Sequence, residues 1–447
     1  MRKLMIMAAL MAVSVQSYSQ SGTKSPYNQY GFGAVSDQSV GFNKGMNGAG
    51  VASRHHNQVN PLNPASYSSI DSLSFIFDAG MSAQITHYKE GNISKNAKSG
   101  SFDYVVAGFK AFKHVGVSFG LLPLTSIDYA YSTSQKVGDA SERYTYNAYI
   151  GTGGLRHVYL GIGWEPFKGV SLGTNVSYLW GTYSRSVGNV FLKAPMNDPE
   201  STSELSSKQD YSINTLTRYY TARLSSYKLD FGAQVEIPFT KKNIVTLAAT
   251  YSIGHKLGTN AECEVISKNP TTEAADTTSY TLENPYKLPA ALSLGLEYKY
   301  NNQFRLAVDY TLQKWASTGF PEYRNTETGG EYILNNDYFK DRHSVKVGFE
   351  YCKNENARAF LSRLRYRAGV GFASPYYKIS GNDGPKEISV SAGFGIPIVN
   401  SWNNRSFINI SAQWVKNEAK GMLKENTFRI NIGLTFNERW FQKWKFN

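Results

Sequence analysis

Two short glycine–serine motifs are the first candidates for chemistry in this chain of 447 residues. Residues 116–120 (GVSFG) and 169–173 (GVSLG) match the G-x-S-x-G pattern of hydrolase nucleophiles. Such a serine must lie on a sharp turn between a strand and a helix. Ser118 and Ser171 instead lie in or at the start of alternating apolar runs, and no helical pattern follows. We therefore predict no catalytic residue at either serine.

Patterns that could bind a metal or cofactor are equally thin. His55 and His56 are adjacent, so in extended backbone they point in opposite directions, and no Cys or acidic residue lies near at ligand spacing. The glycines of residues 45–50 have the wrong order for a dinucleotide-binding loop and lack its strand–helix context. We expect no enzyme, no metal site and no cofactor, and interpret the two histidines as part of a solvated turn.

Charged residues form a more regular set, on one face of successive extended runs. In a membrane barrel, inward-facing charges line a polar lumen or contact a segment held inside it. The inward-facing charges predicted on this basis are Asp309, Lys346, Glu350, Arg365 and Arg367, with Arg305 beside them.

The elements that would position these charges are strands of period two. Residues 73–85 alternate with the single exception of Ile76, which is longer than the usual soluble strand of about five or six residues. A tilted transmembrane strand needs roughly nine to eleven residues. Fourteen such runs recur, at 73–85, 105–111, 115–121, 158–164, 170–180, 227–235, 245–251, 292–298, 304–312, 345–351, 364–372, 388–396, 408–414 and 428–436.

The connections between these runs alternate in length. Short turns separate some runs, whereas long polar segments separate the others, at 87–99, 132–156, 185–223, 253–287 and 316–341. Outer-membrane barrels combine short periplasmic turns with long outer loops. A soluble sandwich or propeller also alternates, but it does not predict this loop pattern. The sequence therefore predicts an all-β fold, a transmembrane antiparallel β-barrel of about fourteen strands.

The first twenty residues are predicted to be a signal peptide. Arg2 and Lys3 precede an apolar run at residues 4–15, and Ser17 and Ser19 provide small residues for cleavage. The run is too short for a membrane-spanning helix, and no later stretch reaches the about 18 apolar residues that such a helix needs. We therefore expect an exported protein of the cell outer membrane.

The formal net charge of +13 suggests partners with negative charge. No basic helix or aromatic–basic RNA-binding signature is present, so we expect no nucleic-acid partner. Headgroups of membrane lipids and lipopolysaccharide suit this charge better. A small hydrophobic ligand and other envelope proteins are further candidate partners.

The segment before the first strand is predicted to be a plug. Residues 45–72 are rich in Gly, Asn, Ser and Pro and have no periodicity. We assign residues 21–72 to a plug entering the lumen from the periplasmic side, and residues 73–447 to the barrel with a short aromatic and basic tail. The plug motif comprises Asn60, Pro61, Asn63, Pro64 and Ala65, in which each Asn-Pro step restricts the asparagine to extended backbone. A rigid structural turn is the preferred interpretation over a direct ligand role.

With its strand count, the Asn63-Pro64-Ala65 motif resembles the FadL-type outer-membrane transporters of hydrophobic compounds. Residues 153–161 (GGLRHVYLG), followed by a turn and residues 170–173 (VSLG), are similar to a strand pair of that family. The sequence as a whole is similar to a divergent branch of this family that is common in Bacteroidota. The resemblance implies a plugged lumen and passive uptake of small hydrophobic molecules, fatty-acid-like or aromatic.

The same resemblance implies a kink in the third strand that opens a side passage to the bilayer. Here that strand meets Leu122, Pro123 and Leu124, and proline marks a bulge, an edge or a break. The alternative is that the strand ends at the membrane interface there. The tail, with Trp440 and Trp444, suits either an interfacial anchor or a docking patch.

Two functions therefore remain open from the sequence. The first is a transporter of the kind described above. The alternative is a non-transporting structural subunit of an outer-membrane secretion or barrel-assembly complex, using its outer loops and barrel wall for protein contacts. A lipid hydrolase has no supporting catalytic triad.

Overall fold

The computed structural model describes residues 25–138, 143–196, 201–326, 329–399 and 405–439. The expected signal peptide and the tail aromatics from Trp440 onward lie outside these ranges. Among the described residues, no helix is long and apolar enough to span a membrane.

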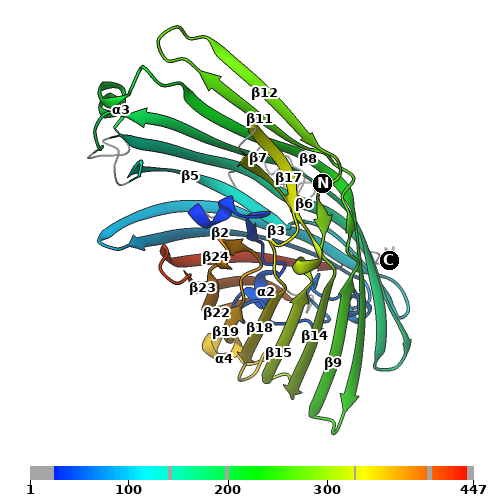
Figure 1. Cartoon of the computed structure of the whole chain (residues 1–447). Helices are drawn as coiled ribbons and strands as arrows, with labels where there is room; N and C mark the ends of the chain where they lie inside the picture. The colour runs from blue at the N-terminus through cyan, green and yellow to red at the C-terminus, as the bar shows by residue number, and fades with distance from the viewer. Residues whose placement is uncertain (1–24, 139–142, 197–200, 327–328, 400–404, 440–447) are drawn as a thin grey trace, which may run out of the picture.

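A closed antiparallel barrel of fourteen strands forms the body of the molecule (Figure 1). Each strand pairs with its neighbours in chain order, and β2 pairs with β24 to close the barrel. The third strand consists of two pieces, β4 and β5, separated at Leu124. The barrel strands are β2 (Ser74–Glu90), β3 (Ile93–Phe112), β4 (Val115–Pro123), β5 (Thr125–Lys136), β6 (Tyr144–Phe167), β7 (Val170–Leu192), β8 (Thr215–Pro238), β9 (Asn243–Ser252), β14 (Ala291–Tyr300), β15 (Phe304–Gln313), β18 (Arg342–Tyr351), β19 (Arg365–Ala373), β22 (Lys386–Val399), β23 (Arg405–Glu418) and β24 (Lys424–Arg439).

The fourteen predicted runs all overlap barrel strands, so the predicted fold class is confirmed. Their apolar face points outward: Leu160, Val176 and Leu294 are among many large apolar side chains exposed on the outer surface. Ile76, the exception in the first run, is fully buried among Val59, Ile70 and other apolar residues inside the barrel. The exception arises because the interior there contacts apolar side chains of the N-terminal segment.

The barrel wall is much taller on one side, which the sequence did not predict. β6, β7 and β8 have 24, 23 and 24 residues, whereas β9, β14, β15 and β18 have 10 each. Figure 1 shows β7, β8 and the β11–β12 hairpin reaching far beyond the shorter strands. The outer part of β8 pairs with β11 (Ala261–Lys268) instead of β9, and β12 (Ala275–Leu282) pairs with β11.

Several predicted loops are therefore strands. Most of 132–156 belongs to β5 and β6, the two ends of 185–223 belong to β7 and β8, and 87–99 is a tight hairpin of β2 and β3. The predictions failed because these extensions rise past the apolar outer band, where the outward face is no longer consistently apolar. On β8, for example, Tyr220, Ala222 and Leu224 are buried inside, whereas Thr221 and Arg223 are exposed. Backbone pairing between β7 and β8 continues there.

The remaining elements are short. The N-terminal segment contains η1 (Pro26–Gln29), β1 (Ala34–Val35), α2 (Gly41–Lys44) and η2 (Pro64–Ser69). The connections contain α3 (Thr202–Lys208), β10 (His255–Lys256), β13 (Lys287–Leu288), η3 (Trp315–Ser317), β16 (Phe320–Thr326), β17 (Gly329–Asn335), α4 (Phe360–Arg363), β20 (Lys378–Ile379) and β21 (Asn382–Asp383).

Candidate functional site in the barrel lumen

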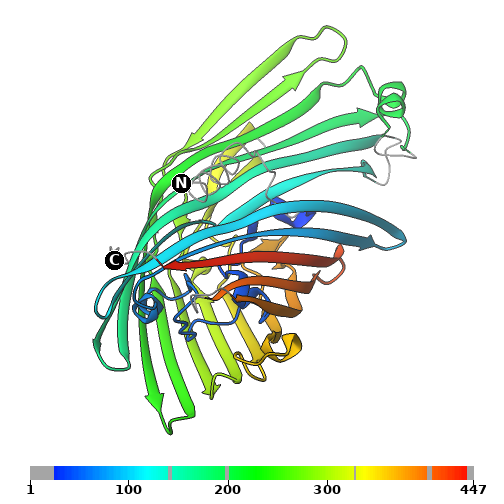
Figure 2. The ribbon, with the colours of Figure 1, turned by 180° about the vertical axis from the view of Figure 1, so that it is seen from behind.

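The N-terminal segment, residues 25–72, lies inside the barrel (Figures 1 and 2). The helix η2 packs against β4, β6, β7 and β8. Gly163, Gly173 and Gly232 make room for it, since a Cβ atom at these positions would lie 2.5, 2.4 and 2.8 Å from atoms of Pro64. The barrel wall is thus shaped to accept this one turn of the segment.

The two asparagines of the predicted plug motif bind backbone groups. Asn60 Nδ2 donates to the carbonyl oxygens of Gly50 (2.7 Å) and Ser53 (3.0 Å). Asn63 is extended, caps η2 by accepting from the Ala65 amide (3.0 Å), and donates to the Val51 carbonyl (3.1 Å). Its fixed backbone follows from the proline after it, and its cap from an asparagine side chain at a helix start.

The other members of the motif lie at different depths. Ala65 is fully buried, whereas Pro61 is half-buried and lines a cavity together with Pro64. The motif therefore mainly stabilises the fold of the N-terminal segment, and its two prolines border the cavity.

Four of the charged side chains converge in the interior. Glu350 accepts from Arg367 (2.7 Å) and Arg365 (2.8 Å), and Arg305 lies 3.5 Å from it. Each of these side chains is at most 7% exposed. Three guanidinium groups around one carboxylate form a network in which removal of the acid would leave buried, uncompensated charge.

His55 contacts this network, which corrects the expected solvated turn. Its ring lies 2.9 Å from Arg305 Nη1 and packs edge-on against Phe42, with centroids 4.5 Å apart. Burial and the nearby Arg305 guanidinium lower the pKa of His55 well below its usual value. The imidazole is therefore neutral in this environment. His56, in contrast, is exposed.

Asp309 and Lys346 each hold a different part of the N-terminal segment. Asp309 accepts the backbone amides of Gly50 (2.6 Å) and Val51 (3.0 Å). Lys346 Nζ lies 3.2 Å from Asp37 Oδ1. The five predicted inward-facing charges thus all face the interior, but only Glu350, Arg365 and Arg367 form one cluster.

The motif serines also face the interior and contact structural partners. Ser118 donates to the Ala107 carbonyl (2.9 Å) and lies 2.9 Å from Tyr159 Oη. Ser171 contacts Arg54 and Ser68. Among the described residues, no group of three His, Cys, Asp or Glu side chains could hold a metal ion.

The third strand bends where the sequence places Leu122, Pro123 and Leu124. On one edge its pairing with β6 continues: Pro123 pairs with Arg156, and Leu124 N donates to Leu155 O (2.7 Å). On the other edge, the pairs with β3 end at Val105↔Leu121, and no described pair joins β3 to β5. We call the region between β3 and β5 the seam; Figures 1 and 2 show the two strands spreading apart there.

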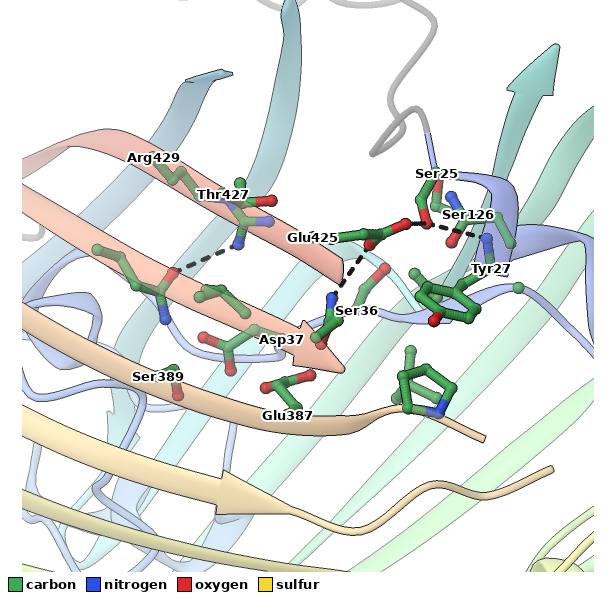
Figure 3. Close-up of a pocket in the computed structure, with 18 of the residues that line it drawn as sticks. Ser25, Tyr27, Ser36, Asp37, Ser126, Glu387, Ser389, Glu425, Thr427 and Arg429 are labelled. Atoms are coloured by element: carbon green, nitrogen blue, oxygen red, sulfur yellow. Dashed lines mark hydrogen bonds between the residues drawn. The ribbon is translucent and has the colours of Figure 1, made fainter. Parts of the chain in front are cut away.

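Two cavities flank the N-terminal segment beside the seam. The β24 cavity, about 220 Å³, has Ser25, Ser36 and Asp37 of the segment facing Glu387, Glu425 and Arg429 (Figure 3). The β8 cavity, about 250 Å³, has apolar lining from Leu62, Leu124 and Leu155 and polar lining from His157, Lys228 and Asp230.

Toward the long loops, an aromatic cluster that no sequence pattern predicted covers the lumen. Phe32 of the N-terminal segment lies 5.7 Å from the ring of Trp315 and 6.2 Å from that of Phe339. Arg185 lies over the Tyr183 ring at 4.8 Å and donates to the Gln29 carbonyl at 2.8 Å. The many aromatic side chains within 315–339 and at 376–377 could have indicated such a cluster, but the residues they contact are distant in the chain.

The fold is similar to the toluene transporter TodX of Pseudomonas putida (TM-score 0.57, 14% identity, 91% of this chain and 100% of that chain). It is also similar to a FadL homologue of Pseudomonas aeruginosa (0.57, 13%, 90% and 98%) and to the CymD monoaromatic hydrocarbon channel (0.56, 14%, 92% and 100%). At these identities the likeness concerns the fold, which is FadL-like.

No curated protein matches the sequence. A family model does, under the description BamG, over residues 1–447. Because that match spans the entire sequence, the chain belongs to the BamG family.

Proposed function

We propose that this protein is an outer-membrane barrel that lets small hydrophobic molecules pass from its lumen into the bilayer through the seam. The observation that carries the proposal is the loss of β3 pairing beyond Leu121, at the bend before β5. An interrupted ladder in a barrel wall is costly in lipid, because unpaired backbone there has no water partners. Such an interruption has a functional explanation if the wall must open.

The β8 cavity supports this route. Leu124, at the bend, lines it together with Leu62 and Leu155. Six of its charged side chains form pairs: Lys228 with Asp230, Lys346 with Asp37, and Arg342 with Glu387 at 3.8 Å. Asp309 also lines the cavity and accepts the Gly50 and Val51 amides without a cationic partner among the described residues. Because the described lining offers no unpaired cation to an anionic ligand, a neutral apolar molecule suits the cavity better than a carboxylate. In this proposal residues 25–72 act as the plug, and the exposed apolar outer band contacts lipid.

Uptake into liposomes tests the proposal. Proteoliposomes containing the full chain should take up a neutral probe such as toluene faster than empty liposomes. Leu124→Asp places a charge beside the apolar lining and should reduce uptake by about tenfold or more, because a buried unpaired charge disfavours apolar contents. Leu361→Asp is the matched control, since Leu361 is 66% exposed beyond the short-turn end. Uptake no faster than empty liposomes would remove the transport function.

A non-transporting subunit of an envelope complex is the second candidate. The specific observation in its favour is that the N-terminal segment occupies much of the lumen: it contacts barrel strands through η1, α2 and η2, and the aromatic cluster covers the loop end. Membership of the BamG family is consistent with a role in a barrel-assembly complex. The tall wall of β6 to β8, with the β11–β12 hairpin, would then present the contact surface.

Purification from native envelopes in gentle detergent separates the two candidates. A structural subunit should carry large partners in equimolar amounts, measured by quantitative mass spectrometry. A variant lacking the hairpin of residues 261–282 should lose those partners while keeping its folded barrel. Recovery of the protein alone, combined with probe uptake in liposomes, would remove the subunit role.

A further inference from the structure

Two opposite charges that line the β24 cavity have no ion-pair partner among the described residues. Four acidic and four basic side chains line this cavity. Six of them form ion pairs: Asp37 with Lys346 (3.2 Å), Asp103 with Lys44 (3.2 Å) and Glu387 with Arg342 (3.8 Å). Glu425 and Arg429 remain, and each of them bonds only to neutral groups of the described chain. The lining is therefore neutral as a whole, but it holds one carboxylate and one guanidinium that no described charge offsets.

Glu425 is the more deeply buried of the two. It is 1% exposed, and it lies beside Ser25 of the N-terminal segment (Figure 3). The Ser25 hydroxyl donates to Glu425 Oε1, and Asn417 Nδ2 donates to Oε2 at 3.4 Å. Both donors are uncharged, and a buried carboxylate is costly unless a cation accompanies it. The cavity therefore offers a favourable position for a cationic group beside Glu425.

Arg429 lies on the same face of β24, four residues further along the strand. Its Nε donates to Gln84 Oε1 (2.8 Å), and its Nη1 donates to Gln413 Oε1 at 3.4 Å. Both acceptors are neutral amides, whereas a guanidinium group bonds most strongly to a carboxylate, often through two parallel hydrogen bonds. The same cavity therefore offers a favourable position for an anionic group beside Arg429.

The space near the two charges has a polar lining. Figure 3 shows Thr427 between them on β24, with Ser389 of β22 on the same side of the cavity. Hydroxyl and amide side chains can donate to and accept from the backbone of a peptide, and those in the lining are Ser36, Ser389, Gln413, Asn417 and Thr427.

The dimensions of the cavity limit the ligand. Its volume of about 220 Å³ is below the about 300–1,000 Å³ of most ligand pockets, so the ligand must be small. Four residues of a strand advance about 13 Å, and an extended peptide advances about 3.3–3.6 Å per residue. A peptide of about three small residues therefore has end groups at a suitable separation for Glu425 and Arg429.

We propose that the β24 cavity binds a short zwitterionic peptide, with its ammonium group at Glu425 and its carboxylate at Arg429. Such a ligand has no net charge, which suits the neutral lining, and it supplies the opposite charge that each of the two side chains lacks. A simple anion or cation would satisfy one side chain and leave the other. The inference goes beyond the proposed function and does not depend on the passage of hydrophobic molecules.

Three related peptides test the site by isothermal titration calorimetry on the unmodified full chain in detergent. Triglycine carries both end charges near neutral pH, N-acetyl-triglycine lacks the ammonium group, and triglycine amide lacks the carboxylate. Triglycine should bind at least tenfold more tightly than either blocked peptide, because each blocked peptide loses one ion pair. Equal affinities for the three peptides, or no triglycine binding at millimolar concentration, would overturn the proposal.

Two conservative variants assign the ends of the peptide. Glu425→Gln should weaken triglycine binding at least tenfold but leave N-acetyl-triglycine within twofold, because that peptide has no ammonium group. Arg429→Gln should likewise weaken triglycine but leave triglycine amide within twofold. Glu418→Gln is the matched control, since Glu418 pairs with Lys416 and Lys424 outside the cavity, and it should leave all three affinities within twofold. An equal loss for all three peptides in either cavity variant would overturn the role assigned to that side chain.

Discussion

Two parts of the N-terminal segment are held by the same barrel in opposite ways. Residues 41–72 pack into glycine-lined space and contact buried charges. Residues 34–38 instead lie along the edge of β5 and line the two cavities. The first part has interactions that converge from β6, β7, β8 and β15. The second has a two-residue strand. The contrast indicates that several barrel strands hold residues 41–72, whereas residues 34–38 are held mainly by the start of the third strand's second half and by Lys346.

Electrostatics contribute to that contrast. At the firm end, Glu350 is shared by guanidinium groups that are themselves almost fully buried, so each group depends on the others. At the loose end, the Asp37–Lys346 pair is 22% and 29% exposed. Partial exposure weakens such a pair through solvent screening.

The largest effect is expected for Glu350→Ala. It leaves Arg305, Arg365 and Arg367 without their shared carboxylate, and breaking such a buried network costs about 3–5 kcal/mol. Urea unfolding in lipid vesicles would measure the loss of unfolding free energy. Lys340→Ala, which removes an exposed pair with Asp383, should cost less than about 1 kcal/mol. Equal effects of the two changes would refute a special role for the cluster.

Gly173→Leu should come next. A Cβ at Gly173 would already lie 2.4 Å from the Pro64 carbonyl carbon, so a larger side chain must displace η2, and overpacking costs about 1–3 kcal/mol. Limited proteolysis should then cut residues 60–72 faster than in the unmodified protein. Gly188→Leu is the control, because only Thr217 Oγ1 lies near, at 3.9 Å. Unchanged protection of the segment in Gly173→Leu would contradict the tight fit.

Asn63→Ala should have a smaller effect of the same kind. It removes the cap on η2 and the donor to the Val51 carbonyl, and loss of such a cap costs about 0.5–2 kcal/mol. The measurement is the thermal unfolding midpoint, compared with Asn325→Ala on an exposed hairpin. If both variants melt at the same temperature, the asparagine does not stabilise the turn.

The smallest effect concerns the ion pair of Asp37 with Lys346 and depends on pH. Burial alone would raise the pKa of Asp37, but the ammonium groups of Lys346 and Lys44 outweigh it and hold the pKa below its usual range. The carboxylate therefore stabilises the fold above its unfolded pKa of about 3.9, and this contribution is lost as pH falls toward the depressed folded pKa.

Asp37→Asn lacks the stabilising contribution of this carboxylate. Its unfolding free energy should therefore differ from that of the unmodified protein by less than about 1 kcal/mol near neutral pH. It should shrink as pH falls from about 5 to about 2.5. Urea titrations at several pH values would measure this difference. A difference that grows toward acid pH would contradict the assigned ion pair.

Much of the barrel could be predicted from the sequence, because each strand crosses the apolar band and alternates there. Ile76 shows the limit of that signal: it breaks the alternation because of what it packs against. Likewise, His55 has the sequence context of a solvated turn, but Phe42 and Arg305 bury it. Long-range partners of this kind leave no local pattern.

The sequence by itself determined the barrel, its strand number and the inward direction of Asp309, Lys346, Glu350, Arg365 and Arg367, since alternation and charge are local properties of a strand. Only the tertiary structure decided the tall wall, the aromatic cluster and the pairing of β1 with β5. Backbone hydrogen bonds do not depend on the identity of the side chain, so the sequence does not show which strands pair. Contacts such as that between Phe32 and Phe339 join positions far apart in the chain. The pairing of β1 with β5 beside the seam is therefore a property of the folded chain alone.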